Sequence, residues 1–283
     1  MTLVKYNNQD SFQILDNTVL FWDWPNLRLK ILTEKHLSNN TLNRIKALAV
    51  ETGMGKIICC APPSYQEMFL GQGFEVEGKI KGFFAGEDAL CYSYFVSAAR
   101  KLSDNTYNGI FPAGSSWDKV YQADIPSKFP YLMRSAVEAD IPGMISLFRS
   151  VFETYPSAVF DTEYLRANIK TNRVFYKLAV YDNKIIGIAS AEKDSTNLNA
   201  EITDCVTNPQ YRGQGILSEL ISELEEYLDS AGFICLYTLC RATLAAVNKA
   251  FFRQGYSFSG RLIKNCNICG SFEDMNILVK LLA

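Results

Sequence analysis

Two glycines in the segment Gln210 to Gly215 give the sequence its clearest chemical signal. The residues before it, Glu201 to Val206, read as a strand, and apolar residues from Ile216 to Leu228 repeat at helical spacing. The segment therefore joins a strand to a helix, whose first backbone N–H groups lack partners inside the helix. Because glycine has no side chain to keep an anion away from those groups, the segment predicts a phosphate-binding turn.

The spacing separates this turn from two common phosphate loops. The third glycine of the dinucleotide-binding fingerprint is missing, and no Gly-Lys-Ser/Thr follows as in a Walker loop. Gln-x-x-Gly-x-Gly instead resembles the pyrophosphate loop of the GNAT-type N-acetyltransferase superfamily. The resemblance implies acetyl-CoA as cosubstrate. The residues that it assigns to this loop are Gln210, Tyr211, Arg212, Gly213, Gln214, Gly215 and Ile216.

Amide formation requires a base, because an amine with a pKa of about 10.4 is protonated near neutrality. Ala200-Glu201-Ile202 followed by Cys205 resembles the catalytic strand of GNAT enzymes that use a glutamate there. We therefore predict Glu201 as the base, with a solvated strand carboxylate as the alternative. Asp204 is its competitor, although strict alternation places it on the opposite face unless a bulge turns it.

The resemblance also assigns the groups around the thioester. The backbone N–H groups of Cys205 and Val206 would meet the developing oxyanion. In many relatives a tyrosine then protonates the leaving thiolate, but Phe251 stands at that position here. The thiolate would leave unprotonated or take its proton from water. For Asn248, one turn earlier, a contact with CoA, helix packing and surface exposure all remain open.

Polar residues near the C-terminal end predict the acceptor side of the site. In GNAT proteins the connection between the last two strands borders the acceptor, and here it carries carboxylates and amides that can bind a small cation. A nearby arginine would meet an acceptor carboxylate. A polar hairpin loop is the alternative. The predicted acceptor residues are Arg241, Asn265, Asn267, Glu273, Asp274 and Asn276.

This segment, Thr238 to Arg241 and Gly82 to Ala89 together resemble the β-lysine N-acetyltransferase family over nearly the whole chain. The resemblance implies direct acetylation of the terminal amine of β-lysine, in a ternary complex, to the compatible solute Nε-acetyl-β-lysine. It also implies coupling to a lysine 2,3-aminomutase, and it leaves a homodimer open. The alternatives are another small amine, such as a polyamine or lysine, and a non-catalytic acetyl-CoA sensor.

The order of elements from Tyr131 to Leu282 resembles that of the GNAT fold. It implies an α/β (α+β) arrangement with a mixed, mostly antiparallel twisted sheet flanked by helices. Asp182-Asn183 is a recognisable hairpin turn. Strands are predicted at 131–136, 174–181, 184–192, 201–206, 233–240, 256–263 and 276–282, and helices at 138–152, 161–169, 216–228 and 244–252.

An internal repeat accounts for the first part of the chain. Strands are predicted at 12–15, 18–22, 27–32 and 56–61, with a hairpin at 74–96 and a helix that Ser38 or Asn39 caps and Gly53 ends. Three stretches recur in the same order later in the chain. They are Phe69 to Phe74 with Phe251 to Tyr256, Gly78-Lys79-Ile80 with Gly260-Arg261-Leu262, and Glu87-Asp88 with Glu273-Asp274.

We therefore expect a degenerate GNAT-like domain at 1–127 and the catalytic domain at 128–283. Where the glycine loop would fall, the first domain has Lys35 to Asn40, without glycine. It is expected not to hold CoA.

Composition narrows the function classes further. With 48% hydrophobic and 13% aromatic residues the chain can fill buried cores. A net charge of -2 gives no basic footprint for nucleic acid. No segment approaches the ~18 apolar residues of a membrane span, and the first residues have no apolar signal core. We expect a cytoplasmic enzyme that acts on a small-molecule amine, without nucleic-acid or membrane partners.

The eight cysteines are expected to be free thiols in a reducing compartment. The pair Cys266-x-x-Cys269 is the one that has the spacing of metal-binding cysteines. A zinc site would need a second pair, but Cys235 and Cys240 have the wrong interval and the single histidine, His36, is distant in sequence. No metal is predicted.

Overall fold

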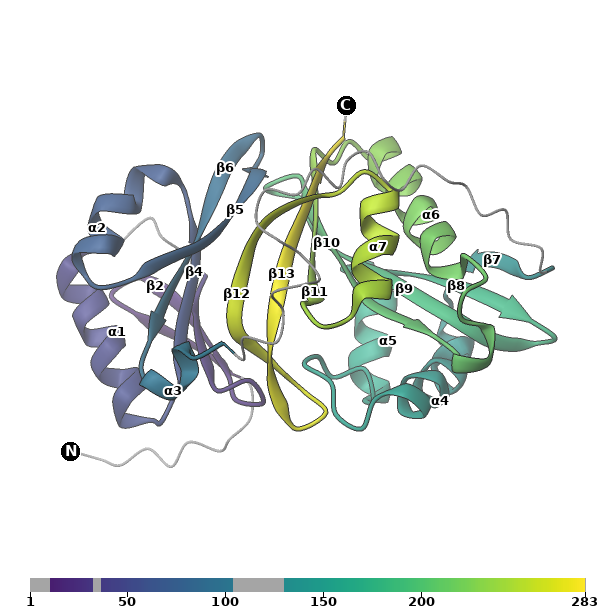
Figure 1. Ribbon diagram of the computed structural model, residues 1–283, viewed down its shortest axis with the longest axis horizontal. Helices are drawn as coiled ribbons and strands as arrows, with labels where there is room; N and C mark the ends of the chain where they lie inside the picture. Colours follow the sequence, from purple (N-terminus) through teal and green to yellow (C-terminus); the bar gives the residue numbers. More distant parts are fainter. Residues whose placement is uncertain (1–10, 33–36, 104–129, 283) are drawn as a thin grey trace.

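The computed structural model describes residues 11–32, 37–103 and 130–282. In these residues the strands form one continuous sheet, in the order β1-β2-β3-β4-β6-β5-β12-β13-β11-β10-β9-β8-β7. Only the β3–β4 and β10–β11 pairs are parallel within it. Helices α1 and α2 lie beside the N-terminal half of the sheet, β1 to β6, and α4 to α7 lie around the C-terminal half, β7 to β13 (Figure 1).

The C-terminal half confirms the predicted GNAT arrangement of a mixed sheet flanked by helices. Asp182 and Asn183 both have positive φ, 49° and 56°, as the predicted hairpin turn requires. The elements are β7 (Leu132–Ser135), η3 (Glu138–Asp140), α4 (Ile141–Val151), α5 (Thr162–Thr171), β8 (Val174–Tyr181), β9 (Lys184–Asp194), β10 (Asn199–Thr207), η4 (Pro209–Tyr211), α6 (Ile216–Ser230), β11 (Cys235–Arg241), α7 (Ala245–Arg253), β12 (Ser257–Ile268) and β13 (Ser271–Leu281).

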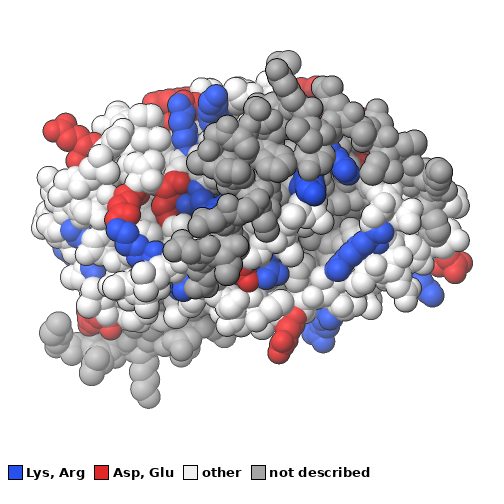
Figure 2. Space-filling model, viewed as in Figure 1, with Lys and Arg blue, Asp and Glu red and all other residues white. Residues whose placement is uncertain are grey.

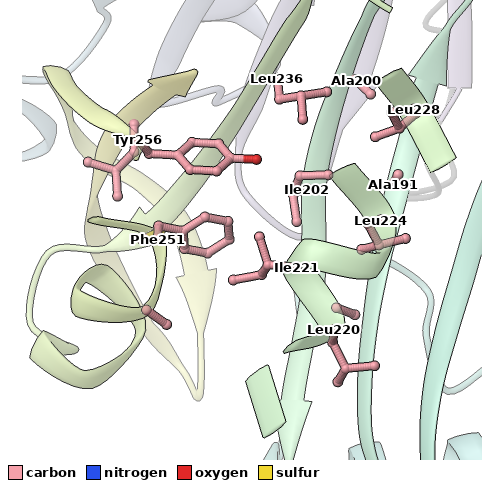
Figure 3. Close-up of a cluster of buried hydrophobic side chains, with 14 of the residues drawn as sticks. Ala191, Ala200, Ile202, Leu220, Ile221, Leu224, Leu228, Leu236, Phe251 and Tyr256 are labelled. Atoms are coloured by element: carbon pink, nitrogen blue, oxygen red, sulfur yellow. The ribbon is translucent and has the colours of Figure 1, made fainter. Parts of the chain in front are cut away.

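Helix α6 is fixed by its apolar stripe. Leu220, Leu224 and Leu228, spaced four residues apart, are fully buried and belong to one hydrophobic cluster with Ala200 and Ile202 of β10 (Figure 3). Burial of a leucine side chain stabilises the fold by roughly 1.5–3 kcal/mol. This packing holds the start of α6 next to the end of β10, which is where the glycine loop lies.

The N-terminal half has its own core. Ser38 caps α1 by accepting a hydrogen bond from the Thr41 backbone N–H at 3.1 Å. Leu42 and Ile45 of this helix are buried in a cluster with Leu29 of β3 and Ile57 of β4. The elements are β1 (Ser11–Leu15), β2 (Thr18–Asp23), β3 (Arg28–Ile31), α1 (Asn39–Glu51), β4 (Lys56–Ala61), η1 (Pro63–Tyr65), α2 (Gln66–Gly71), β5 (Glu75–Phe84), β6 (Glu87–Phe95) and α3 (Ala98–Lys101).

The two halves of the sheet meet at two glycines. β5 pairs with β12 through Gly78 and Gly260, which are residues that the sequence repeat had matched. A Cβ on Gly260 would overlap the Gly78 Cα and approach the Glu77 carbonyl oxygen at 2.5 Å. Only glycine therefore allows this approach of the strands.

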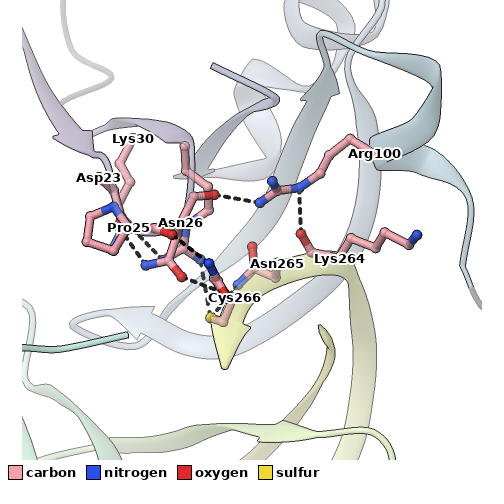
Figure 4. A network of polar contacts seen from close by, with 10 residues as sticks. Asp23, Pro25, Asn26, Lys30, Arg100, Lys264, Asn265 and Cys266 are labelled. Atoms are coloured by element: carbon pink, nitrogen blue, oxygen red, sulfur yellow. Dashed lines mark hydrogen bonds and ion pairs between the residues drawn. The ribbon is translucent and has the colours of Figure 1, made fainter. Parts of the chain in front are cut away.

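Buried polar contacts reinforce this junction (Figure 4). The Arg100 guanidinium donates to the backbone carbonyls of Asn26 at 2.6 Å and Lys264 at 2.7 Å. The Asn267 backbone N–H donates to the Asn26 side chain at 2.7 Å. Lys56 is fully buried, pairs with Glu77 at 2.6 Å and donates to the Ile263 carbonyl. These bonds tie β12 to the N-terminal half.

The last hairpin differs from the sequence prediction. Residues 265–276 were expected to be a connection, yet most of them belong to β12 and β13, which turn at Cys269 and Gly270. A bulge between Leu262 and Cys266 lets the strand continue, with Lys264 at a φ of 40°. The Asp274 carboxylate stabilises the bulge by accepting from the Lys264 N–H at 2.8 Å. The predicted domain boundary and His36 lie outside the described residues.

Candidate active site

The glycine loop has the geometry that its sequence predicts. It follows η4, and Gly213 and Gly215 both have a φ of 79°, which favours glycine. Gly215 is the N-cap of the 15-residue helix α6 and supplies no side-chain cap. The first N–H groups of α6 therefore lack a side-chain acceptor, at the positive end of the helix dipole. The loop can hold an anion such as a phosphate.

Strands β10 and β11 separate beside the loop. Their parallel pairing covers only Asn199 to Glu201 and Cys235 to Tyr237. Both strands continue beyond this point, to Thr207 and to Arg241, without further pairing to each other in the described residues. Their facing backbone groups can therefore hydrogen-bond an extended ligand laid between them.

A bulge in β10 decides the position of Asp204. The β9–β10 register shifts between Thr203 and Val206, and Asp204 has a φ of 48°. Its carboxylate is buried and accepts from the hydroxyls of Ser157 at 3.0 Å and Ser190 at 3.1 Å. Burial raises the Asp204 pKa to about 6, although these two hydrogen bonds lower it. Asp204 is thus held inside the fold by two hydroxyls.

Glu201 has the properties of a base. It lies in the short paired stretch of β10 and is partly buried. Its pKa is raised to about 7, mainly by burial and also by the Glu192 and Asp204 carboxylates, while the Lys30 and Arg28 cations oppose this rise. A carboxylate with this pKa can accept a proton near neutral pH.

The sequence did not reveal two further groups of residues near Glu201. Lys30 and Arg28 come from β3 in the N-terminal half, and no local motif marks them. Tyr155, between α4 and α5, has a phenol whose pKa is raised well above its usual value by burial and then by the charges of Asp204 and neighbouring groups. Only the folded chain brings these residues to one place.

Asn248 and Phe251 are packed inside the protein. The Asn248 amide donates to the backbone carbonyls of Arg241 and Leu244 at 2.9 Å, and its oxygen accepts from Asn276 at 2.9 Å. Phe251 is fully buried and packs edge-on against Tyr256, with ring centroids 5.0 Å apart. Of the three alternatives for Asn248, these contacts match helix packing.

The predicted acceptor residues divide into two groups. Arg241 and Glu273 form an ion pair at 2.6 Å, and Asp274 and Asn276 are buried in bonds that hold the hairpin, including one from Arg261 to Asn276 at 2.8 Å.

The remaining two acceptor residues keep hydrogen-bonding capacity. The side-chain oxygens of Asn265 and Asn267 are buried without a hydrogen-bond partner. A buried acceptor oxygen without a hydrogen-bond donor lowers the stability of the fold.

Cysteines, possible metal ligands, surface charge and long apolar helices bear on other kinds of site and partner. All eight cysteines are free, and no group of three or more potential metal ligands is present in the described ranges. On the face in Figure 2, acidic and basic side chains are interspersed. No helix in the described part of the chain has both the length and the apolar character to cross a membrane.

Comparisons with known proteins identify the family. Residues 141–256 match the model of the acetyltransferase (GNAT) family. The chain is 36% identical to the β-lysine N(6)-acetyltransferase of Methanosarcina mazei, over 84% of this chain and 95% of the relative. It is 31% identical to the N-acetyltransferase YodP of Bacillus subtilis, over 93% and 95%. It is 28% identical to the β-lysine N(6)-acetyltransferase of Methanococcus maripaludis, over 85% and 87%.

The family model matches the C-terminal half, and the matches to the three relatives extend over most of the chain. The chain is therefore an N-acetyltransferase that belongs to the GNAT family and, within it, to the group that includes the β-lysine N-acetyltransferases.

Proposed function

We propose that the protein transfers the acetyl group of acetyl-CoA to the terminal amine of β-lysine. One observation carries the proposal: a carboxylate with a pKa of about 7, Glu201, lies on the strand that leads into an uncapped, glycine-lined helix start. The substrates named for the two relatives from Methanosarcina mazei and Methanococcus maripaludis support β-lysine as the acceptor.

The loop fits the diphosphate of CoA. A Cβ placed on Gly213 would meet nothing within 4 Å, so the space over the loop is open. The backbone of Gln210 to Ile216 would bind the phosphates, with the Arg212 side chain exposed beside them. The separated backbones of β10 and β11 would bind the amides of the pantetheine arm.

Glu201 then removes a proton from the acceptor ammonium. The free amine attacks the thioester carbonyl and a C–N bond forms, while the backbone N–H groups of Cys205 and Val206 stabilise the oxyanion. The C–S bond then breaks, and the new amide nitrogen loses its second proton to water. The CoA thiolate leaves unprotonated or takes a proton from water, because Phe251 has no acidic group that could donate one. Direct attack is favoured because burial raises the Cys205 thiol pKa well above its usual value, which makes it a poor nucleophile.

Of the predicted acceptor residues, Asn265 and Asn267 best fit an ammonium group, since their oxygens lack donors. Arg241 would need to leave Glu273 to bind a carboxylate. Asp204, which two serines hold, is the weaker candidate for the base.

We further propose a cytoplasmic location, which the free thiols fit. An aminomutase that moves the α-amino group of lysine would supply the substrate. We also propose a homodimer, and two domains at residues 1–127 and 128–283.

The proposal is tested by CoA release from acetyl-CoA with β-lysine, α-lysine, ornithine and spermidine, with mass spectrometry of each product. We expect the highest kcat/KM for β-lysine and acetylation at its terminal amine. A higher kcat/KM for another of the four amines would contradict β-lysine as the acceptor and favour the alternative of a different small amine.

A further inference from the structure

The two halves of the sheet repeat the same pairing pattern, and this relates residues that the sequence alone does not align. β5 and β6 bulge between Ile80 and Phe84 as β12 and β13 bulge between Leu262 and Cys266. From these bulges, the pairing of residues can be followed across the neighbouring strands in each half. Ile58 of β4 then lies at the position that is equivalent to Tyr237 of β11.

The parallel partner strands complete the match. Ile58 is opposite Lys30 on β3, and Tyr237 is opposite Glu201 on β10. Lys30 therefore occupies, in the N-terminal half, the position that Glu201 occupies in the C-terminal half. All four residues are partly buried.

Side chains from the two halves of the sheet contact each other around these positions. Tyr237 contacts Phe83 of β5, with ring centroids 5.6 Å apart, and Cys60 of β4 packs on the same apolar cluster as Tyr237. The Arg28 guanidinium, beside Lys30, reaches the Cys266 sulfur at 3.5 Å. The positive charge of Lys30 lowers the pKa of Glu201. If the terminal amine of an acceptor meets Glu201, the other end of the acceptor can extend towards β3.

The charges on the two sides are complementary to a diamino acid. On the β10 side lie the carboxylates of Glu201 and Asp204, together with that of Glu192, which is paired with Arg173 at 2.9 Å. On the β3 side, Asp23 binds Arg28 through two hydrogen bonds, at 3.0 and 2.5 Å. Lys30 pairs with the same carboxylate at the longer distance of 3.5 Å, so Asp23, Arg28 and Lys30 together carry one net positive charge.

We propose that Lys30 binds the carboxylate of the acceptor, so that the N-terminal half selects an amino acid over a simple amine. This inference rests on the proposed function and adds to it the residue that determines specificity. Lys30 is the suitable cation because its side chain is 32% exposed and that of Arg28 only 5%. Its ammonium lies 5.4 Å from the ring centroid of Phe21, its partner on the neighbouring strand β2.

The test compares two acceptors that differ only in that carboxylate, β-lysine and β-lysine carboxamide. For the wild type we expect kcat/KM to favour the acid on the order of 10- to 100-fold, the effect of one charge-assisted hydrogen bond. In Lys30→Gln the ratio should fall towards one, and Lys30→Arg should keep most of it. A changed Glu201 pKa would affect both acceptors alike, so the ratio isolates recognition of the carboxylate.

Two further variants distinguish a role of Lys30 itself from the loss of any positive charge and from carboxylate binding by Arg241. Lys46→Gln removes a charge from α1, which packs on the other face of the N-terminal half, and should keep the wild-type ratio. Arg241→Gln should also keep the ratio, because Arg241 is paired with Glu273.

Equal use of the acid and the carboxamide by the wild type, an unchanged ratio in Lys30→Gln, or a ratio lost only in Arg241→Gln would each overturn the role of Lys30 and leave the proposed function intact. Preference of the wild type for spermidine over β-lysine would overturn both.

Discussion

At the scale of single residues, the environment of Glu201 is what suits it to the proposed role of base. Burial and two carboxylates raise its pKa, and two cations from the other half of the chain oppose them, so the pKa is about 7. The sequence could predict Glu201 from its neighbours on the strand. It could not predict Lys30, because their relation follows from the pairing of distant strands.

Replacing Glu201 by Gln should lower kcat on the order of 100-fold or more, because a positioned base contributes roughly 10²–10⁴-fold. In the wild type, kcat/KM should rise with pH and level off above about 7, where Glu201 is deprotonated. The pH profile of CoA release measures both. Full activity of Glu201→Gln across the pH range would remove Glu201 as the base.

The same substitution should change stability in a pH-dependent way. A carboxyl group whose pKa is raised from 4.5 to about 7 on folding stabilises the protein below pH 4.5, and that contribution is lost as the pH rises through 7. Relative to the wild type, Glu201→Gln should therefore gain roughly 1–3 kcal/mol of unfolding free energy between pH 4.5 and 8. Urea unfolding at both pH values measures this.

Glu226→Gln, on the exposed face of α6, is the matched control for that measurement. It should show little pH-dependent difference from the wild type. If both variants behaved alike, the raised pKa of Glu201 would be in doubt.

At the scale of elements, sequence patterns predicted most helices and strands, and the exceptions have physical causes. β8 and the Asp182-Asn183 turn were predicted because alternation and turn residues are local signals. The bulge at Asp204 was expected only as an alternative to strict alternation, and that at Lys264 was not predicted, because both residues adopt positive φ without being glycine. Their hydrogen bonds to Ser157, Ser190 and Asp274 form only in the folded chain.

The glycine loop gives a prediction at this scale. Gly213→Ala should destabilise the protein by about 1–2 kcal/mol, the cost of a left-handed conformation for a residue with a Cβ. It should also raise the KM for acetyl-CoA severalfold, because the loop would relax away from the anion-binding conformation. Gly213→Asn should lose less, since asparagine tolerates this conformation better. Thermal unfolding and initial rates measure these effects.

Gly71→Ala, at the end of α2, provides the control. A Cβ there would meet nothing within 4 Å, and the φ of Gly71 is not positive. Its unfolding free energy and KM should stay close to those of the wild type. An unchanged KM in Gly213→Ala would mean that the loop does not hold the cosubstrate.

At the scale of the whole molecule, the sequence predicted the repeat but not its consequence. Matching stretches around Gly78 and Gly260 indicated two related halves. That these glycines pair with each other, and so join the halves into one sheet, could not be read from a local pattern. In the proposed mechanism this joining matters, because it brings Lys30 of β3 near Glu201 of β10.

The last prediction concerns this junction. Gly260→Ala should destabilise the protein by about 3 kcal/mol or more, because its Cβ would overlap the backbone of Gly78 and Glu77 rather than a movable side chain. Gly86→Ala is the matched control: its φ of 104° is also positive, but a Cβ there would meet nothing within 4 Å. The difference between the two unfolding free energies therefore measures the close approach alone.

If the halves act as one unit, Gly260→Ala should also raise the KM for β-lysine more than that for acetyl-CoA, since the proposed acceptor site spans the junction and the glycine loop does not. Equal unfolding free energies for the two variants would mean that β5 and β12 can separate without cost, and that the continuous sheet is not what holds Lys30 opposite Glu201.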